Sequence, residues 1–303
     1  MGVLYFLESI RVPGLNELML AVTYFGDEIA FLVTALILYW CVDKKQGYYI
    51  LSVGFIGTLA NQFLKLWFRI PRPWVKDPNF TILEQAREGA TGYSFPSGHT
   101  QSGVGTFGGI AYTAKNRIVR ILAVVVAVLV PISRMYIGVH TPLDVMVAAA
   151  MAVVLIIVLR PVIFSHDGKY IPWLLGIMTL LAVAYLCFVE FYPFPADVDA
   201  YNLSHGLQNA YTLLGSLVGL LVAYLVDEKW LHFPTKAAWW AQILKVAIGL
   251  GLVLIIKSGM KIMLNGIFGE LAGRAVRYFL MVLMAGTVWP LTFKYFARTK
   301  TKE

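Results

Sequence analysis

Apolar runs long enough to cross a lipid bilayer recur along the whole chain, and they restrict it to a membrane fold. About nine such runs are present, each with boundaries good to a few residues: 18–42, 47–66, 97–114, 117–136, 142–164, 171–191, 206–226, 239–260 and 276–297. Since hydrocarbon offers the backbone no hydrogen-bonding partner, runs of this length are expected to be α-helices. The sequence therefore predicts an all-α fold, a polytopic membrane helix bundle of about nine transmembrane helices.

The composition excludes the alternative of a large water-soluble helical protein. Hydrophobic residues make up 59% of the chain, charged residues only 14%, and the mean hydropathy is +0.71. The third and fifth runs are rich in small residues, namely Gly103, Gly105, Gly108 and Gly109, and Ala148, Ala149 and Ala150. Small residues let helix backbones approach closely, so these two helices are expected inside the bundle.

The N-terminal segment and the cysteines give weaker information. No basic segment precedes the first apolar run, so we expect no cleavable signal peptide. Residues 3–17 mix apolar and charged side chains, which is typical of a helix lying at the membrane interface. Cys41 and Cys187 fall on different faces of the span model and are expected to be free thiols.

The distribution of Lys and Arg predicts the orientation in the membrane. Loop cations are concentrated on one side, from Lys44 and Lys45 to Lys300 and Lys302 near the C-terminus. By the positive-inside rule this side is cytoplasmic, so we expect a multi-pass cell-membrane protein with a cytoplasmic C-terminus. The net charge of +8 is then mostly a topology signal. It does not indicate nucleic-acid binding, because the cations are spread over short loops without a basic stripe.

Three short motifs carry the candidate chemistry. They are Lys65 followed after six residues by Arg72-Pro73; Pro96-Ser97-Gly98-His99; and Ser133-Arg134, five residues, His140, three residues and Asp144. Together they supply three cations, two imidazoles, one carboxylate and a glycine-bearing turn, which is the inventory needed to hold a phosphate and pass it to a histidine. All three lie at ends of spans that emerge on the same, extracytoplasmic side, although the motif pattern does not require this.

The cations at span ends have two interpretations. Lys65, Arg69 and Arg72 share one face of a helix end, and Pro73 biases Arg72 out of helical geometry. Such residues usually extend to the headgroups, and we accept that interpretation for Arg69, which lies outside the motif spacing. For Lys65, Arg72 and Arg134 the neighbouring motifs favour phosphate binding, and the planar fork of arginine suits phosphate oxygens.

The two histidine motifs are expected at helix N-termini. Ser97 is expected to cap the third span, which places His99, a candidate general acid, beside free backbone N–H groups that attract anions. Gly98 would let a phosphate approach the backbone. Thr141-Pro142 is typical of a helix start, so Asp144 in the first turn can orient His140 as a nucleophile. Plain capping by Ser97 and a favourable first-turn acid at Asp144 are the alternatives.

These residues and gaps closely resemble the type-2 phosphatidic acid phosphatase superfamily, which includes lipid phosphate phosphatases, isoprenyl pyrophosphate phosphatases and glucose-6-phosphatase. The resemblance covers residues from about 60 to 165. It implies a phosphohistidine mechanism without metal or other cofactor. By position, it implies that His140 is the nucleophile, Asp144 its orienting residue and His99 the acid. The phosphate-binding residues that it implies are Lys65, Arg72, Arg134, Ser97 and Gly98.

The sequence thus predicts a membrane phosphatase acting on an amphiphilic, lipid or isoprenyl phosphate or pyrophosphate at the extracytoplasmic face. Residues 1–165 are expected to form the phosphatase core, and residues 166–303 to add transmembrane helices packed on it. A soluble sugar phosphate as substrate, a lipid phosphotransferase, and a transporter or scaffold that keeps a phosphate-binding cleft stay open as alternatives. Membrane lipids are the expected partners. Lys245, deep in a later span, is expected to extend to the headgroups.

Overall fold

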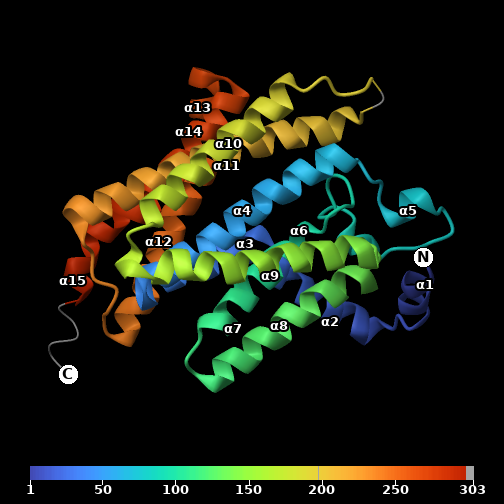
Figure 1. Ribbon diagram of the computed structural model, residues 1–303, viewed down its shortest axis with the longest axis horizontal. Coiled ribbons are helices and arrows are strands. Elements are labelled where there is room, and N and C mark those ends of the chain that lie inside the picture. The colour runs from blue at the N-terminus through green and yellow to red at the C-terminus, as the bar shows by residue number, and fades with distance from the viewer. Residues whose placement is uncertain (197, 298–303) are drawn as a thin grey trace. The chain divides into compact units, whose positions relative to one another are not determined.

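The computed structural model describes residues 1–196 and 198–297, and these residues form helices and loops without any β-strand (Figure 1). The expected all-α fold is confirmed. The elements of the first half are α1 (Gly2–Ser9), α2 (Pro13–Thr23), η1 (Tyr24–Gly26), α3 (Glu28–Ile37), η2 (Leu38–Val42), α4 (Lys44–Phe68), α5 (Pro73–Lys76), η3 (Glu84–Ala86), α6 (Gly98–Gly103), η4 (Val104–Gly108), α7 (Gly109–Thr113) and α8 (Arg117–Tyr136).

The second half is dominated by long helices. Its elements are α9 (Pro142–Phe164), η5 (His166–Gly168), α10 (Ile171–Phe191), α11 (Ala200–Val226), η6 (Asp227–Leu231), α12 (Trp239–Gly259), α13 (Lys261–Phe268), α14 (Glu270–Leu283), η7 (Met284–Val288), η8 (Trp289–Thr292) and α15 (Phe293–Ala297). The C-terminus, which the charge bias places in the cytoplasm, lies outside the described residues.

The helices agree roughly with the nine predicted spans. Seven helical stretches of the described chain are long and apolar enough to cross a membrane. The first predicted span is bent by 56° between Pro13–Gly26 and Glu28–Val42, and counts as an eighth if the pair is one span. The predicted span at 97–114 is a shorter helical segment in three pieces, α6, η4 and α7.

Contacts divide the chain into two compact units. Unit 1 comprises residues 1–32, 53–160 and 194–205, and unit 2 comprises residues 33–52, 161–193 and 206–303. Unit 2 therefore includes the first residues of α4, together with the later helices. The division into a core of residues 1–165 and added helices 166–303 stays a prediction.

Capping residues define where the helices of unit 1 begin. Asn116 caps α8 by accepting hydrogen bonds from the N–H groups of Ile118 (2.8 Å) and Val119 (3.2 Å). At the start of α9 the Thr141 hydroxyl accepts from the N–H of Asp144 (3.3 Å), while the Asp144 carboxylate accepts from the N–H of Thr141 (2.8 Å). This reciprocal capping box confirms the helix start predicted at Thr141-Pro142.

A small residue brings two helices of unit 1 close together, as predicted for the third apolar run. A Cβ added at Gly103 would lie 2.8 Å from the Val130 side chain, so α6 can approach α8 only because this position is a glycine. The fifth run, which forms α9, is less enclosed than expected, since Ala148 is buried but Ala150 is exposed. The predicted interfacial segment 3–17 is also helical, as α1 and the first turns of α2.

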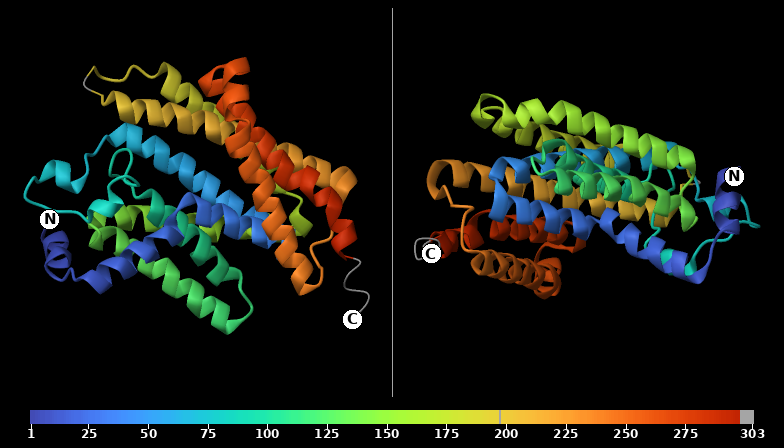
Figure 2. Two further views of the ribbon diagram at one scale, coloured as in Figure 1. Left: turned by 180° about the vertical axis from the view of Figure 1, so that it is seen from behind. Right: turned by 90° about the horizontal axis from the view of Figure 1, so that it is seen from below.

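In unit 2, α10 and α11 run side by side in Figure 1 and in the left view of Figure 2. The Tyr185 hydroxyl donates to the Gly206 carbonyl at 3.3 Å, which links the two helices.

The expectation that Lys245 extends to the headgroups is wrong. Its side chain is fully buried, and its ammonium donates to the carbonyls of Trp40 (2.8 Å) and Thr235 (3.0 Å) and lies 4.2 Å from the centre of the Phe293 ring. Two carbonyl acceptors and an aromatic face inside unit 2 therefore satisfy this ammonium.

Candidate active site

The three motifs meet at one end of unit 1. This end contains the last turns of α4 and α8 and the first turns of α6 and α9, on the side where the N-terminus is marked in Figure 1. The N–H of Ser97 donates to the backbone carbonyl of Asp144 at 3.1 Å, so the second and third motifs are joined directly. The three motifs therefore lie together at one end of unit 1, as expected, and the side of the membrane on which this end opens stays a prediction.

The three motif cations are buried. Only 8% of Lys65, 6% of Arg72 and 3% of Arg134 is exposed, so none of them extends to a headgroup region. The Lys65 ammonium donates to the carbonyl of Tyr93. Arg69, as expected, is not part of this cluster, and its guanidinium bonds its own helix at Leu66 (3.2 Å). Three buried positive charges at one helix-bundle end form a site for a multiply charged anion.

Arg72 is held rigidly just beyond the end of α4. Its backbone is extended (φ −65°, ψ 156°), as the following proline predicted, and it caps α5. Its guanidinium donates to three backbone carbonyls, those of Gly92 (3.0 Å), Thr91 (2.6 Å) and Val139 (3.0 Å). These bonds fix the planar fork, so that a phosphate would meet a preorganised cation.

His140 lies between Arg72 and Asp144, with 1% of the residue exposed. Nη1 of Arg72 lies 2.9 Å from Nε2 of the ring, and because a guanidinium can only donate, Nε2 carries the lone pair. The proton of the neutral ring is therefore on Nδ1, which lies 3.5 Å from the Asp144 carboxylate. The expected pairing of His140 with Asp144 is present, at a distance long for a hydrogen bond and within ion-pair range.

Burial is the main factor that lowers the pKa of His140 well below its usual value, and the positive charges of Arg72, Arg134 and Lys65 add to it. The charge of His99 acts in the same direction, so the two imidazoles are close enough for their charges to interact. A ring that stays neutral with its Nε2 lone pair directed at a cation cluster can act as a nucleophile towards a bound phosphate.

The α6 motif forms a helix start. Ser97 is fully buried and its hydroxyl accepts a hydrogen bond from the N–H of Thr100 (3.3 Å), which confirms the predicted N-cap. At Gly98 an added Cβ would make only an ordinary contact of 3.8 Å with the Asn61 amide. The fold itself therefore does not require glycine there, and the absence of a side chain leaves the backbone N–H groups of the first turn accessible. His99 follows in that turn.

Four polar residues of the site were missed at the sequence level. The Ser94 hydroxyl donates to the Asp144 carboxylate at 2.6 Å, and the Thr23 hydroxyl accepts from Arg134 at 2.7 Å. Asp27 lies 3.8 Å from His99. Asn61 is buried, and neither atom of its amide has a hydrogen-bond partner among the described residues. Asn61 lies one helical turn before Lys65 and shares its face, a signal that the spacing could have given.

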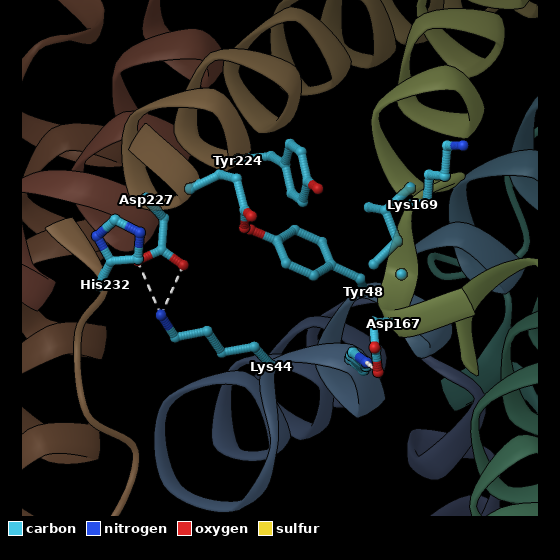
Figure 3. A pocket seen from close by; sticks show the side chains of 11 residues that line it. Lys44, Tyr48, Asp167, Lys169, Tyr224, Asp227 and His232 are labelled. Carbon is cyan, nitrogen blue, oxygen red and sulfur yellow. Dashed lines mark hydrogen bonds and ion pairs between the residues drawn. The ribbon is translucent and has the colours of Figure 1, made fainter. Parts of the chain in front are cut away.

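A second polar hollow, in unit 2, has a different charge balance. It encloses about 330 Å³, and its lining includes Lys44, Lys45, Lys169, Asp167, Asp227 and Glu228. Figure 3 shows the ammonium of Lys44 directed at the buried carboxylate of Asp227, to which it is paired at 2.7 Å. Three lysines therefore face three carboxylates, which leaves no excess positive charge for a phosphate. The motif site has three cations and the single motif carboxylate, Asp144.

A polytopic helix bundle that holds a histidine–aspartate pair among buried cations is the architecture of a membrane-embedded phosphatase. The PAP2 superfamily profile matches residues 45–167, and a second profile, PAP2 superfamily phosphatase, transmembrane extension, matches residues 211–301. The chain belongs to the PAP2 superfamily, and the resemblance seen in the motifs is confirmed. The helices beyond residue 210 are a recognised extension of this superfamily.

Curated relatives are phosphatases by name. The chain is 30% identical to phosphatidylglycerophosphatase B of Bacillus subtilis, over 50% of this chain and 76% of that protein. It is 33% identical to undecaprenyl-diphosphatase of Sulfolobus acidocaldarius, over 45% of this chain and 64% of that protein. It is 25% identical to sphingosine-1-phosphate phosphatase 1 of Mus musculus, over 79% of this chain and 58% of that protein. No solved structure matches the chain.

Proposed function

We propose that this protein hydrolyses a lipid or isoprenyl phosphate or pyrophosphate through a phosphohistidine at His140. The observation that carries the proposal is the position of the His140 ring. Its Nε2 lone pair lies 2.9 Å from the Arg72 guanidinium, and its Nδ1–H faces Asp144 at 3.5 Å. A phosphate held by Arg72 would present its phosphorus to this lone pair.

The proposed reaction has two steps. In the first, Nε2 of His140 bonds to phosphorus, the bond from phosphorus to the leaving oxygen breaks, and His99 gives its proton to that oxygen. In the second, His99 takes a proton from water, the water oxygen bonds to phosphorus, and the bond to His140 breaks. Lys65, Arg72 and Arg134, with the N–H groups that follow Ser97 and Gly98, stabilise the charge on the transferring group. Apart from the attacking water, both steps use protein groups alone, without metal.

The substrate class is inferred from the kind of protein and its relatives. The named relatives act on phosphatidylglycerophosphate, undecaprenyl diphosphate and sphingosine 1-phosphate, which all combine a phosphate with an apolar chain. A site at the end of membrane helices allows the tail to stay in hydrocarbon while the phosphate reaches the cations. The division of the chain into a phosphatase core of residues 1–165 and added helices of residues 166–303 belongs to the same proposal.

We also propose that the site opens on the extracytoplasmic side, because loop cations are concentrated on the opposite side. The test uses a protein in which Cys41 and Cys187 are replaced by serine, with one new cysteine at exposed Glu88 or at exposed Lys229. A membrane-impermeant maleimide added to intact cells is expected to label the position 88 variant. Labelling of the position 229 variant instead would reverse the topology.

The enzymatic test measures phosphate release by purified protein in detergent with a chelator present. We expect turnover by the wild type, none by His140→Ala, and an acid-labile phosphate on quenched wild-type enzyme. The matched control is His205→Ala, which removes an imidazole that packs on Tyr201 (4.5 Å between ring centres) and is expected to keep activity. Turnover by His140→Ala would exclude the phosphohistidine.

One substrate panel decides among the remaining alternatives. Phosphatidic acid, phosphatidylglycerophosphate, an isoprenyl pyrophosphate and a sugar phosphate are compared at equal concentrations. We expect the amphiphilic substrates to give the higher kcat/KM. A preference for the sugar phosphate would refute the lipid assignment, and transfer of the phosphate to an added lipid alcohol without release would identify a phosphotransferase.

A further inference from the structure

The bend in the first membrane segment brings a carboxylate to the candidate general acid. Asp27 lies at the break between Pro13–Gly26 and Glu28–Val42, where the helix axis turns by 56°. Its carboxylate oxygen Oδ2 lies 3.8 Å from Nε2 of His99. None of the three motifs includes Asp27, which precedes the first of them by 38 positions in the chain.

Close packing fixes Asp27 at this place. A Cβ added at the preceding Gly26 would lie 2.6 Å from the carbonyl oxygen of His99 and 2.7 Å from Val130, so only glycine allows the chain to pass this close to α6. The other carboxylate oxygen of Asp27 accepts a hydrogen bond from the N–H of Ile29 (2.8 Å). One oxygen therefore caps α3, which leaves Oδ2 directed at the imidazole.

His99 lies among positive charges, and this is why a nearby carboxylate matters for its protonation. Charged or titratable groups from four parts of the chain surround the ring, and they are Lys65 on α4, Arg72 before α5, Arg134 on α8 and His140 before α9. The carboxylate of Asp27 also acts on one of them, Arg134. Three of these groups are cations, and each opposes protonation of His99. A general acid must nevertheless carry its proton when the leaving oxygen departs. Among the described residues, Asp27 is the carboxylate within ion-pair distance of His99.

We propose that Asp27 is a positioning residue that stabilises the protonated form of His99 in the reaction proposed above. It acts by charge at 3.8 Å and does not touch the substrate. In the first step His99 gives its proton to the leaving oxygen, and in the second it receives one from the attacking water. The Asp27 carboxylate balances the charge of the imidazolium each time it forms. This inference rests on the proposed function.

The test is the pH profile of kcat/KM for Asp27→Asn, measured between pH 5 and 9. Asparagine is as good an N-cap as aspartate, so the start of α3 is preserved and only the charge is lost. Without the carboxylate, His99 loses its proton at lower pH. We therefore expect the basic limb of the kcat/KM profile to move down by about one pH unit, the lower end of the range for a neighbouring opposite charge, because the pair is partly exposed. The two side chains are 23% and 39% exposed. Above both midpoints, kcat/KM then falls about tenfold, while below them it is unchanged.

Two further variants separate charge from structure. Asp27→Glu restores the carboxylate and is expected to return the basic limb most of the way to the wild-type position. Asp43→Asn makes the same exchange at an equivalent cap, in which the carboxylate accepts from the N–H of Gln46 (3.1 Å) at the opposite end of α4 from Lys65. It removes a charge far from His99 and is expected to leave the profile unchanged.

The possible outcomes are distinct. A uniform loss of activity at every pH in Asp27→Asn, or a basic limb that coincides with that of the wild type, would overturn the role of Asp27 while leaving the phosphatase mechanism intact. Absence of phosphate release by the wild type, or full turnover by His140→Ala, would overturn both proposals.

Discussion

Asp144→Asn tests whether the charge beside His140 contributes to catalysis. The Asp144 carboxylate oxygen Oδ2 accepts from the Ser94 hydroxyl (2.6 Å) and from the N–H of Thr141 (2.8 Å). The amide oxygen of asparagine can accept both hydrogen bonds, so the start of α9 and the local fold are expected to persist. What disappears is one negative charge, 3.5 Å from Nδ1 of His140.

The size of the effect follows from this distance. When Nε2 attacks phosphorus the ring becomes positively charged, and two unit charges 3.5 Å apart attract by roughly 5 kcal/mol at an effective dielectric constant of about 20. Only 2% of either side chain is exposed, so screening by water is weak. Allowing for adjustment of the site, we expect a loss of roughly 3–5 kcal/mol of transition-state stabilisation, or about 10²- to 10⁴-fold in kcat.

The assay is phosphate release in detergent at saturating substrate, combined with the melting temperature of each variant. Ser94→Ala provides a graded comparison, since it removes a neutral donor and keeps the charge, and it should cost about 1.5 kcal/mol, or roughly tenfold in kcat. A folded Asp144→Asn protein with kcat within tenfold of the wild type would refute the assignment of Asp144. A larger loss in Ser94→Ala than in Asp144→Asn would show that hydrogen bonding, and not charge, is decisive.

Three more predictions follow from the geometry. Because burial lowers the pKa of His140, its ring stays neutral as the pH falls. The acid limb of the pH profile of kcat/KM should therefore have its midpoint below about pH 6.5. A midpoint above that value would contradict the burial argument. Gly26→Ala should lower the melting temperature and the activity, with a loss of about 1–3 kcal/mol in the free energy of unfolding, because the new Cβ would lie 2.6 Å from a backbone oxygen of α6. Gly14→Ala is the control, since no atom lies within 4 Å of its new Cβ, and it should be neutral. Equal effects of the two substitutions would contradict the packing argument. Asp227→Asn should destabilise unit 2 by on the order of 2 kcal/mol through loss of its ion pair, without changing kcat; an unchanged melting temperature would contradict this.

The sequence predicted most of the spans because their signal is local. An apolar run of sufficient length must be helical in hydrocarbon wherever it occurs, and caps such as Ser97 and Thr141-Pro142 act within one helical turn. The bend at Asp27 was missed, since it falls inside a continuous apolar run and depends on packing of Gly26 against α6. The third span was predicted as one helix, yet it contains a π-helical segment at Val104–Gly108.

Burial of the cations could be inferred only in part. Spacing alone made Lys65, Arg72 and Arg134 candidates, but span-end lysines and arginines often extend to headgroups, as was wrongly expected for Lys245. The choice between these outcomes depends on which carbonyls are within reach. For Arg72 these are the carbonyls of Thr91, Gly92 and Val139, which come from two separate loops.

The sequence by itself determined that this chain is a helical membrane protein, because the length and apolar character of its runs are properties of the chain alone. The resemblance of its motifs also identified the PAP2 superfamily and the residues that carry the motifs. Only the tertiary structure decided which nitrogen of His140 carries the lone pair, since that depends on Arg72, 68 positions away in the chain. It also decided that Ser94, Thr23 and Asp27 join the site. Such contacts arise where helix ends far apart in the sequence are packed together, and no local pattern records them.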